Sequence, residues 1–100
     1  MKRLNPVHPG EILKYDFMEP FGLSSNALAR AIGVTPARVN EIVRERRGIT
    51  AETALRLAKY FKTDPQSWMN LQDQYELAIA KQSVAKDLRT IEPIAHAVTN

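Results

Sequence analysis

The stretch RAIGVTPARVNEIVRERRGIT, residues 30–50, decides the fold because it ends one helix and starts another within a few residues. Gly33 can adopt the left-handed backbone conformation that closes a helix. Thr35 is suited to cap the next helix, and Pro36 to occupy its first position, where a missing N–H costs nothing. Two short helices joined by a glycine-containing turn form a helix-turn-helix. The stretch therefore predicts this motif.

Apolar residues recur at helical spacing on both sides of the turn. We expect the two helices of the motif at residues 24–33, with Ser24 as the cap, and at residues 36–45. No stretch of the chain alternates apolar and polar residues in the manner of a strand. The sequence therefore predicts an all-α fold.

Three more helices are expected around this motif. Pro9 suits the start of the first, which Pro20 should end. Thr50 suits the cap of another. The pair Asp64-Pro65 repeats the cap-then-proline start, and the helix that follows it should run to about residue 82.

Length and composition limit the class of protein. The chain has 100 residues, 44% of them hydrophobic, which suits one domain with a small core. It contains no cysteine, which excludes disulfides and cysteine-based zinc sites and agrees with a reducing cytoplasm. No apolar run approaches the roughly 20 residues that span a bilayer, and the N-terminus lacks the apolar segment of a secretory signal. We expect a cytoplasmic protein with no membrane partner.

Positive charge is concentrated in the middle of the chain. The net charge is +3, yet residues 30–62 hold eight basic and three acidic residues, while the rest holds six basic and eight acidic residues. A local basic excess suits a polyanionic partner such as DNA. By charge alone, a solvated helical surface explains it equally well.

The second helix of a helix-turn-helix places its N-terminal residues against base edges in the major groove. Arg38 can reach guanine O6 and N7, and Asn40 can reach adenine N6 and N7. Thr35 and Ala37 are small enough for close approach or for contact with a thymine methyl, and Glu41 can accept from cytosine. The base-contact candidates are therefore Thr35, Ala37, Arg38, Asn40 and Glu41.

The arginines at and after the end of this helix suit contacts to phosphates, which position DNA without reading its sequence. A serine in the first turn of the preceding helix can add one more. The phosphate-contact candidates are Ser25, Arg44, Arg46 and Arg47. Glu41 has an alternative to cytosine, because it can pair with Arg38 or Arg44 on its own helix.

Four blocks in this order resemble the HigA-type antitoxins, a group within the xenobiotic-response-element class of helix-turn-helix regulators. The resemblance covers about residues 6–80, and residues 83–100 depart from it. Its blocks are PVHPGEIL (6–13), LARAIGVTPARVNEIV (28–43), RRGITAETALRLAKYF (46–61) and SWMNLQDQYEL (67–77).

The resemblance implies a five-helix, lambda-repressor-like DNA-binding domain that forms a homodimer, with a C-terminal extension. It maps the recognition helix onto residues 35–44 and the dimer surface onto the helix that begins near Pro65. The domain would then span residues 1–82, followed by a tail of residues 83–100. Family members repress their own operon and bind HigB, a RelE-like toxin that cleaves mRNA.

Dimerisation also has a physical argument, because one short helix reads few base pairs and a dimer on a palindromic operator doubles the contact. The last helix carries more apolar residues than one face of a small bundle needs. We expect Trp68 and Leu71 in the core, and Tyr75, Leu77 and Ile79 at the dimer interface. Alternatively the apolar residues of this helix simply close the core, and Leu77 is a lone exposed leucine.

Catalysis is not expected. The two histidines, His8 and His96, lie near the ends of the chain, and His8 is expected to cap or pack on the first helix. No histidine–carboxylate cluster has zinc-ligand spacing, and there is no glycine-rich phosphate loop, so we expect neither metal nor cofactor. Two alternatives to an antitoxin remain: a stand-alone helix-turn-helix regulator, and a helical protein-interaction module with little DNA affinity.

Overall fold

The computed structural model describes residues 6–95, and all of its regular elements are helical. The all-α prediction is confirmed. The α-helices are α1 (Pro9–Ile12), α2 (Ser25–Ile32), α3 (Pro36–Val43), α4 (Ala51–Phe61), α5 (Pro65–Ser83) and α6 (Ala85–Leu88). Two irregular helices follow α1 directly: a π-helical segment η1 (Leu13–Met18) and a 3₁₀ segment η2 (Glu19–Phe21).

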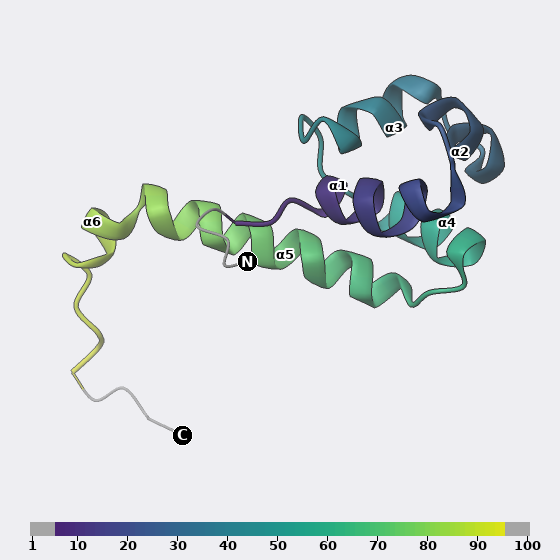
Figure 1. Ribbon diagram of the computed structural model, residues 1–100. Coiled ribbons are helices and arrows are strands. Elements are labelled where there is room, and N and C mark those ends of the chain that lie inside the picture. Colours follow the sequence, from purple (N-terminus) through teal and green to yellow (C-terminus); the bar gives the residue numbers. More distant parts are fainter. Residues whose placement is uncertain (1–5, 96–100) are drawn as a thin grey trace.

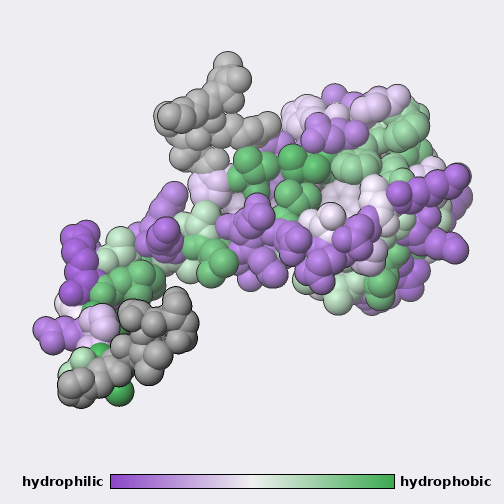
Figure 2. All heavy atoms as spheres, turned by 90° about the horizontal axis from the view of Figure 1, so that it is seen from below, coloured by the Kyte–Doolittle hydropathy of each residue, from purple (hydrophilic) through white to green (hydrophobic). Residues whose placement is uncertain are grey.

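The helices α1 to α4 form a compact head, and α5 runs beneath it and projects well beyond it (Figure 1). The short α6 lies at the far end of this projection, which gives the molecule principal extents of 55 × 26 × 26 Å. Viewed from below, hydrophobic residues lie among hydrophilic ones on the projecting end (Figure 2). None of the helices described for residues 6–95 is long and apolar enough to cross a membrane.

The helix starts follow the predicted capping residues. The hydroxyl oxygens of Ser24, Thr35 and Thr50 each accept from the backbone N–H three residues further on, at 3.0, 3.2 and 3.3 Å. Gly33 ends α2 in the left-handed conformation, with φ 76°. His8 caps α1, since its Nδ1 accepts from the Gly10 N–H at 2.9 Å. These predictions are confirmed.

Two predictions about helix ends fail: the end of the first segment at Pro20, and the side-chain cap of α5, although α5 does begin at Pro65 as predicted. Pro20 does not end the first segment, because it occupies an early position of η2, where a proline needs no N–H. The chain turns away at Gly22, whose φ is 64°. Asp64 precedes α5 but does not cap its backbone: its carboxylate instead accepts from the Ser67 hydroxyl at 3.4 Å.

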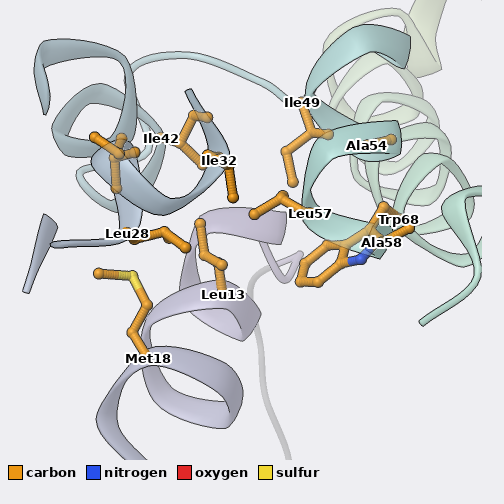
Figure 3. Packing of buried hydrophobic residues seen from close by; sticks show 12 residues of the cluster. Leu13, Met18, Leu28, Ile32, Ile42, Ile49, Ala54, Leu57, Ala58 and Trp68 are labelled. Carbon is orange, nitrogen blue, oxygen red and sulfur yellow. The ribbon is translucent and has the colours of Figure 1, made fainter. Parts of the chain in front are cut away.

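The protein has one hydrophobic core, and the side chains that point into it come from η1, α2, α3, α4 and α5 and from the loop before α4 (Figure 3). Trp68 anchors α5 there, 2% exposed, and its Nε1 donates to the Thr63 hydroxyl at 2.9 Å. Leu71, also predicted in the core, is half-buried at its edge. The buried hydrophobic residues of this core are Leu13, Met18, Leu28, Ala29, Ile32, Val39, Ile42, Ile49, Ala54, Leu57, Ala58 and Trp68.

Beyond residue 82 the described part of the tail is exposed throughout. Helix α5 ends at Ser83, close to the predicted end at about residue 82. The tail therefore begins with the last residue of α5 and includes α6. His96 lies outside the described residues.

Candidate nucleic-acid interface

The helix-turn-helix is built from α2 and α3, which cross closely. Ala29 is fully buried, as a small residue at a close helix crossing should be. Gly33 and Val34 both donate to the Ala29 carbonyl, at 2.9 and 3.0 Å, and Val34 packs against the core. This closure sends the chain into α3, whose inner face is formed by Val39 and Ile42, each 1% exposed.

The predicted base-contact residues differ in their exposure to solvent. Thr35 and Ala37 are exposed at the start of α3, although the Thr35 hydroxyl already serves as the helix cap. Asn40 and Glu41 are half-exposed on the outer part of the helix. Arg38 is also half-buried and lies on the flank that faces α4 and α5. The roles of these residues in DNA contact remain predictions.

Glu41 forms an ion pair, but not within its own helix. Its Oε1 lies 3.2 Å from Nε of Arg47, and both side chains are 47% exposed. The predicted partners, Arg38 and Arg44, are therefore wrong, because α3 ends in time for the following loop to bring Arg47 back beside Glu41. A pair this exposed contributes at most about 1 kcal/mol to folding.

The loop after α3 closes tightly and exposes its arginines. Glu45 takes the left-handed conformation, with φ 63°, although it is not glycine. The N–H groups of Arg46 and Arg47 then both donate to the Glu41 carbonyl, at 2.8 and 3.2 Å. Arg44, Arg46 and Arg47 are all exposed as a result, on a backbone fixed by the helix end, while Ser25 is half-exposed in the first turn of α2.

An open groove of about 620 Å³ lies between α3, this loop, α4 and α5. Arg38 and Arg47 line it together with the first turn of α4, whose free N–H groups carry partial positive charge. Two carboxylates, those of Glu52 in that first turn and of Glu76 in α5, also line the groove. The positive part of this groove suits an anion such as a DNA phosphate.

Gln72 is a residue that the sequence analysis missed. It is buried in α5, 6% exposed, and its side chain reaches the backbone of the loop after α3. One clue was present in the sequence, since Gln72 follows Trp68 by one helical turn and so occupies a core-facing position. A polar residue at such a position needs a specific partner.

The predicted dimer residues differ in exposure and in surroundings. Tyr75 is half-buried, and its ring packs edge-on against His8 with centroids 4.7 Å apart. Leu77 and Ile79 are 70% and 41% exposed. Leu77 lines an apolar groove of about 610 Å³ with Val84 and Leu88, and Ile79 is not among the residues of that groove.

Burial of the ring lowers the pKa of His8 below its ordinary value, and the carboxylate of Glu45 opposes this shift. His8 therefore favours the neutral form in the folded chain, as its role as an acceptor at Nδ1 requires. Among the described residues, no group of three or more histidine, aspartate or glutamate side chains could hold a metal ion.

A family model described as helix-turn-helix matches residues 15–68. Virulence-associated protein I of Dichelobacter nodosus is 59% identical over 76 residues, which cover 76% of this chain and 70% of that protein. Antitoxin HigA-1 of Vibrio cholerae is 33% identical over 90 residues, which cover 89% of this chain and 84% of the relative.

Solved structures agree in fold. The Pseudomonas aeruginosa antitoxin HigA, solved with the higBA promoter, has a TM-score of 0.87 and 50% identity over 90% of this chain and 99% of its own. The antitoxin GraA in complex with its operator has a TM-score of 0.85 and 40% identity over 95% and 98%. With the helix-turn-helix in place and these relatives matched over most of their length, the chain belongs to the HigA-type family of helix-turn-helix antitoxins.

Proposed function

We propose that this chain is the antitoxin of a type II toxin–antitoxin pair, which binds a palindromic operator as a homodimer and represses its own operon. The observation that carries the proposal is the 50% identity to an antitoxin that was solved with its promoter DNA. The basic surface around α3 supports the same conclusion on independent physical grounds.

On DNA, α3 enters the major groove and the loop after it meets the phosphates. The residues that read bases are Thr35, Ala37, Arg38, Asn40 and Glu41. Those that contact phosphates are Ser25, Arg44, Arg46 and Arg47. Glu41 releases Arg47 when it turns to a base, and Arg47 is then available to the backbone of the DNA.

Dimerisation uses the projecting part of α5. This helix belongs to a domain of residues 1–82, and residues 83–100 follow the domain as a tail. Leu77 supports this proposal, because 70% of this large apolar side chain is exposed and it lines an apolar groove. An exposed apolar surface of this kind is stabilised by burial against a second copy. Tyr75 and Ile79 contribute at its edge.

The toxin is a RelE-like, mRNA-cleaving protein of the HigB type. Support for a toxin partner comes from relatives named as antitoxins, among them HigA-1 of Vibrio cholerae. The antitoxin acts by protein–protein contact that blocks the toxin, and no catalytic step is assigned to this chain.

A two-part cell assay tests the proposal. The DNA directly upstream of the coding region is fused to a reporter, and the gene next to it is expressed from a separate inducible promoter. The proposal expects that this chain lowers reporter output and restores growth when the neighbouring gene arrests it. Repression without rescue favours a stand-alone regulator, and rescue without repression favours an interaction module.

A further inference from the structure

Gln72 links α5 to the loop that carries the phosphate-contact arginines. Its Oε1 accepts from the Ile49 N–H at 2.7 Å, and its Nε2 donates to Oε2 of Glu76 at 2.7 Å. Both polar ends of the buried amide are therefore occupied. Ile49 is itself buried, 3% exposed, so the loop is fixed at this point by a hydrogen bond and by packing.

The orientation of the Gln72 amide is determined by its two partners. An ionised carboxylate such as Glu76 accepts hydrogen bonds only, so it must face the NH₂ group of the amide. A backbone N–H donates only, so Ile49 must face the amide oxygen. Both contacts therefore favour the same orientation of the amide. By accepting from Nε2, Glu76 keeps Oε1 of Gln72 directed toward the loop.

The loop approaches Gln72 so closely that a side chain at residue 48 would displace the Gln72 amide. A Cβ at Gly48 would lie 2.5 Å from Nε2 and 2.6 Å from Oε1 of Gln72. The side chain of Gln72 cannot swing aside without losing its two hydrogen bonds. The backbone of Gly48 and Ile49 therefore rests directly on the amide.

Arg47 precedes this contact, and the chain between α3 and the contact is short. The arginines Arg44, Arg46 and Arg47 lie between the end of α3 and Gly48. Their backbone is held at one end by the Glu41 carbonyl and at the other by Gln72. A change at Gln72 therefore removes the hydrogen bond at the second attachment without removing any arginine from the chain.

We propose that Gln72 is a positioning residue for DNA binding. From α5, it fixes the loop that carries Arg46 and Arg47 in the position from which these arginines reach the DNA phosphates. The proposal rests on the DNA-binding function proposed above. Glu76 takes part by holding the Gln72 amide in the orientation that the loop requires.

The first test replaces Gln72 by methionine, which keeps the length and burial of the side chain but cannot accept strongly from Ile49. Operator affinity should fall about tenfold, and the slope of log affinity against log salt should decrease by about one unit as one phosphate contact is lost. Amide exchange at Ile49 should become faster. Met69→Ala is the matched control in α5, because Met69 packs against the core without touching the loop hydrogen bond, and it should leave the slope unchanged.

A charge-conserving exchange provides the rescue. In the double variant Q72E/E76Q, the new carboxylate accepts from Ile49 and from the new amide, so the hydrogen bonds are restored with unchanged net charge. The double variant should recover the wild-type salt slope and come within about threefold of wild-type affinity.

A milder pair of variants keeps the test decisive if Q72M does not fold. Glu76 is exposed, so its replacement leaves the core intact. Glu76→Ala and Glu76→Gln both remove one negative charge, but only the second variant keeps a side-chain oxygen that can accept from Gln72. Glu76→Ala should bind the operator about threefold more weakly than Glu76→Gln, with faster amide exchange at Ile49.

The outcomes separate this proposal from the proposed function. If wild-type chain binds the operator and Q72M, or the Glu76 pair, shows no such difference, Gln72 has no positioning role. The same conclusion follows if Met69→Ala lowers the slope as much as Q72M does, or if Q72E/E76Q fails to recover it. If wild-type chain binds neither operator nor random DNA, both proposals are overturned together.

Discussion

Gly10 lies against the backbone of Ile42, so close that a β-carbon at Gly10 would overlap the Ile42 carbonyl oxygen. This contact packs α1 directly onto α3 and so supports the proposed recognition helix from behind. Gly10→Ala should lower the free energy of unfolding by about 1–3 kcal/mol, because the overlap forces the two helices apart. Urea unfolding followed by circular dichroism measures the change.

The matched control for this prediction is Asn26→Ala, an exposed position in α2. It should change stability by less than about 0.5 kcal/mol. A Gly10→Ala variant as stable as wild type would show that α1 and α3 need not meet so closely.

His8 makes stability depend on pH. Its Nδ1 accepts from Gly10 only when the ring is neutral, and burial lowers its pKa in the folded state. The contribution of His8 is therefore complete above its unfolded pKa of about 6.5 and is lost as the pH falls through the lower folded value. We expect the unfolding free energy to decrease between pH 7 and pH 5 more steeply for wild type than for His8→Asn, since asparagine can cap without titrating. Parallel pH profiles for the two proteins would remove His8 as the cause.

Lys62 ends α4 in the left-handed conformation, with φ 58°, and so occupies a position where glycine carries less strain. Lys62→Gly should raise the free energy of unfolding by about 0.5–1 kcal/mol. Lys59→Gly, inside the same helix, should lower it by about 1 kcal/mol. Thermal unfolding of the two variants decides the matter, and a loss of stability in both would mean that the side chain of Lys62 matters more than its backbone.

Alanine substitutions at Arg38 and at Arg46 should have different effects on DNA binding. Arg38→Ala should cost about 1–3 kcal/mol on the operator and relax specificity at one base pair, since it is proposed to read a base. Arg46→Ala should weaken binding to all sequences and lower the salt slope by about one unit, because it is proposed to contact a phosphate. Titrations with operator and random DNA compare the two. An equal loss on both DNAs would exclude Arg38 from base contact, and an unchanged slope would exclude Arg46 from phosphate contact.

Leu77 should determine the association of two chains. Leu77→Glu places a charge in the apolar groove of α5 and should weaken dimerisation at least about tenfold in sedimentation experiments, because burial of the charge is costly. Leu55→Glu is the control, since Leu55 is 60% exposed on α4 and lies outside that groove. If the Leu77 variant remains as dimeric as wild type, the α5 groove is not the dimer surface.

The local features of the fold could be predicted because they depend on near neighbours. Ser24, Thr35 and Thr50 cap their helices through hydrogen bonds that span three residues. Gly33 closes α2 because of its own backbone freedom. The buried faces of α2, α3 and α4 follow from helical spacing alone.

Features that depend on tertiary packing could not be predicted. The ion pair of Glu41 with Arg47 requires the path of the loop after α3, which helix spacing does not contain. The bond from Gln72 to Ile49 joins residues 23 positions apart and exists only after α5 packs on the head. Pro20 suggests a helix break, but an early helical position tolerates it, so the irregular turn and Gly22 determine the end instead.

Binding of the purified chain to its own upstream DNA, compared with scrambled DNA of the same length, tests the central claim most directly. Fluorescence anisotropy is recorded over a range of salt from about 50 to 200 mM. The proposed function predicts operator binding at least about 10³-fold tighter than binding to scrambled DNA, with a steep fall of affinity as salt rises. Equal and weak binding to both DNAs would contradict it.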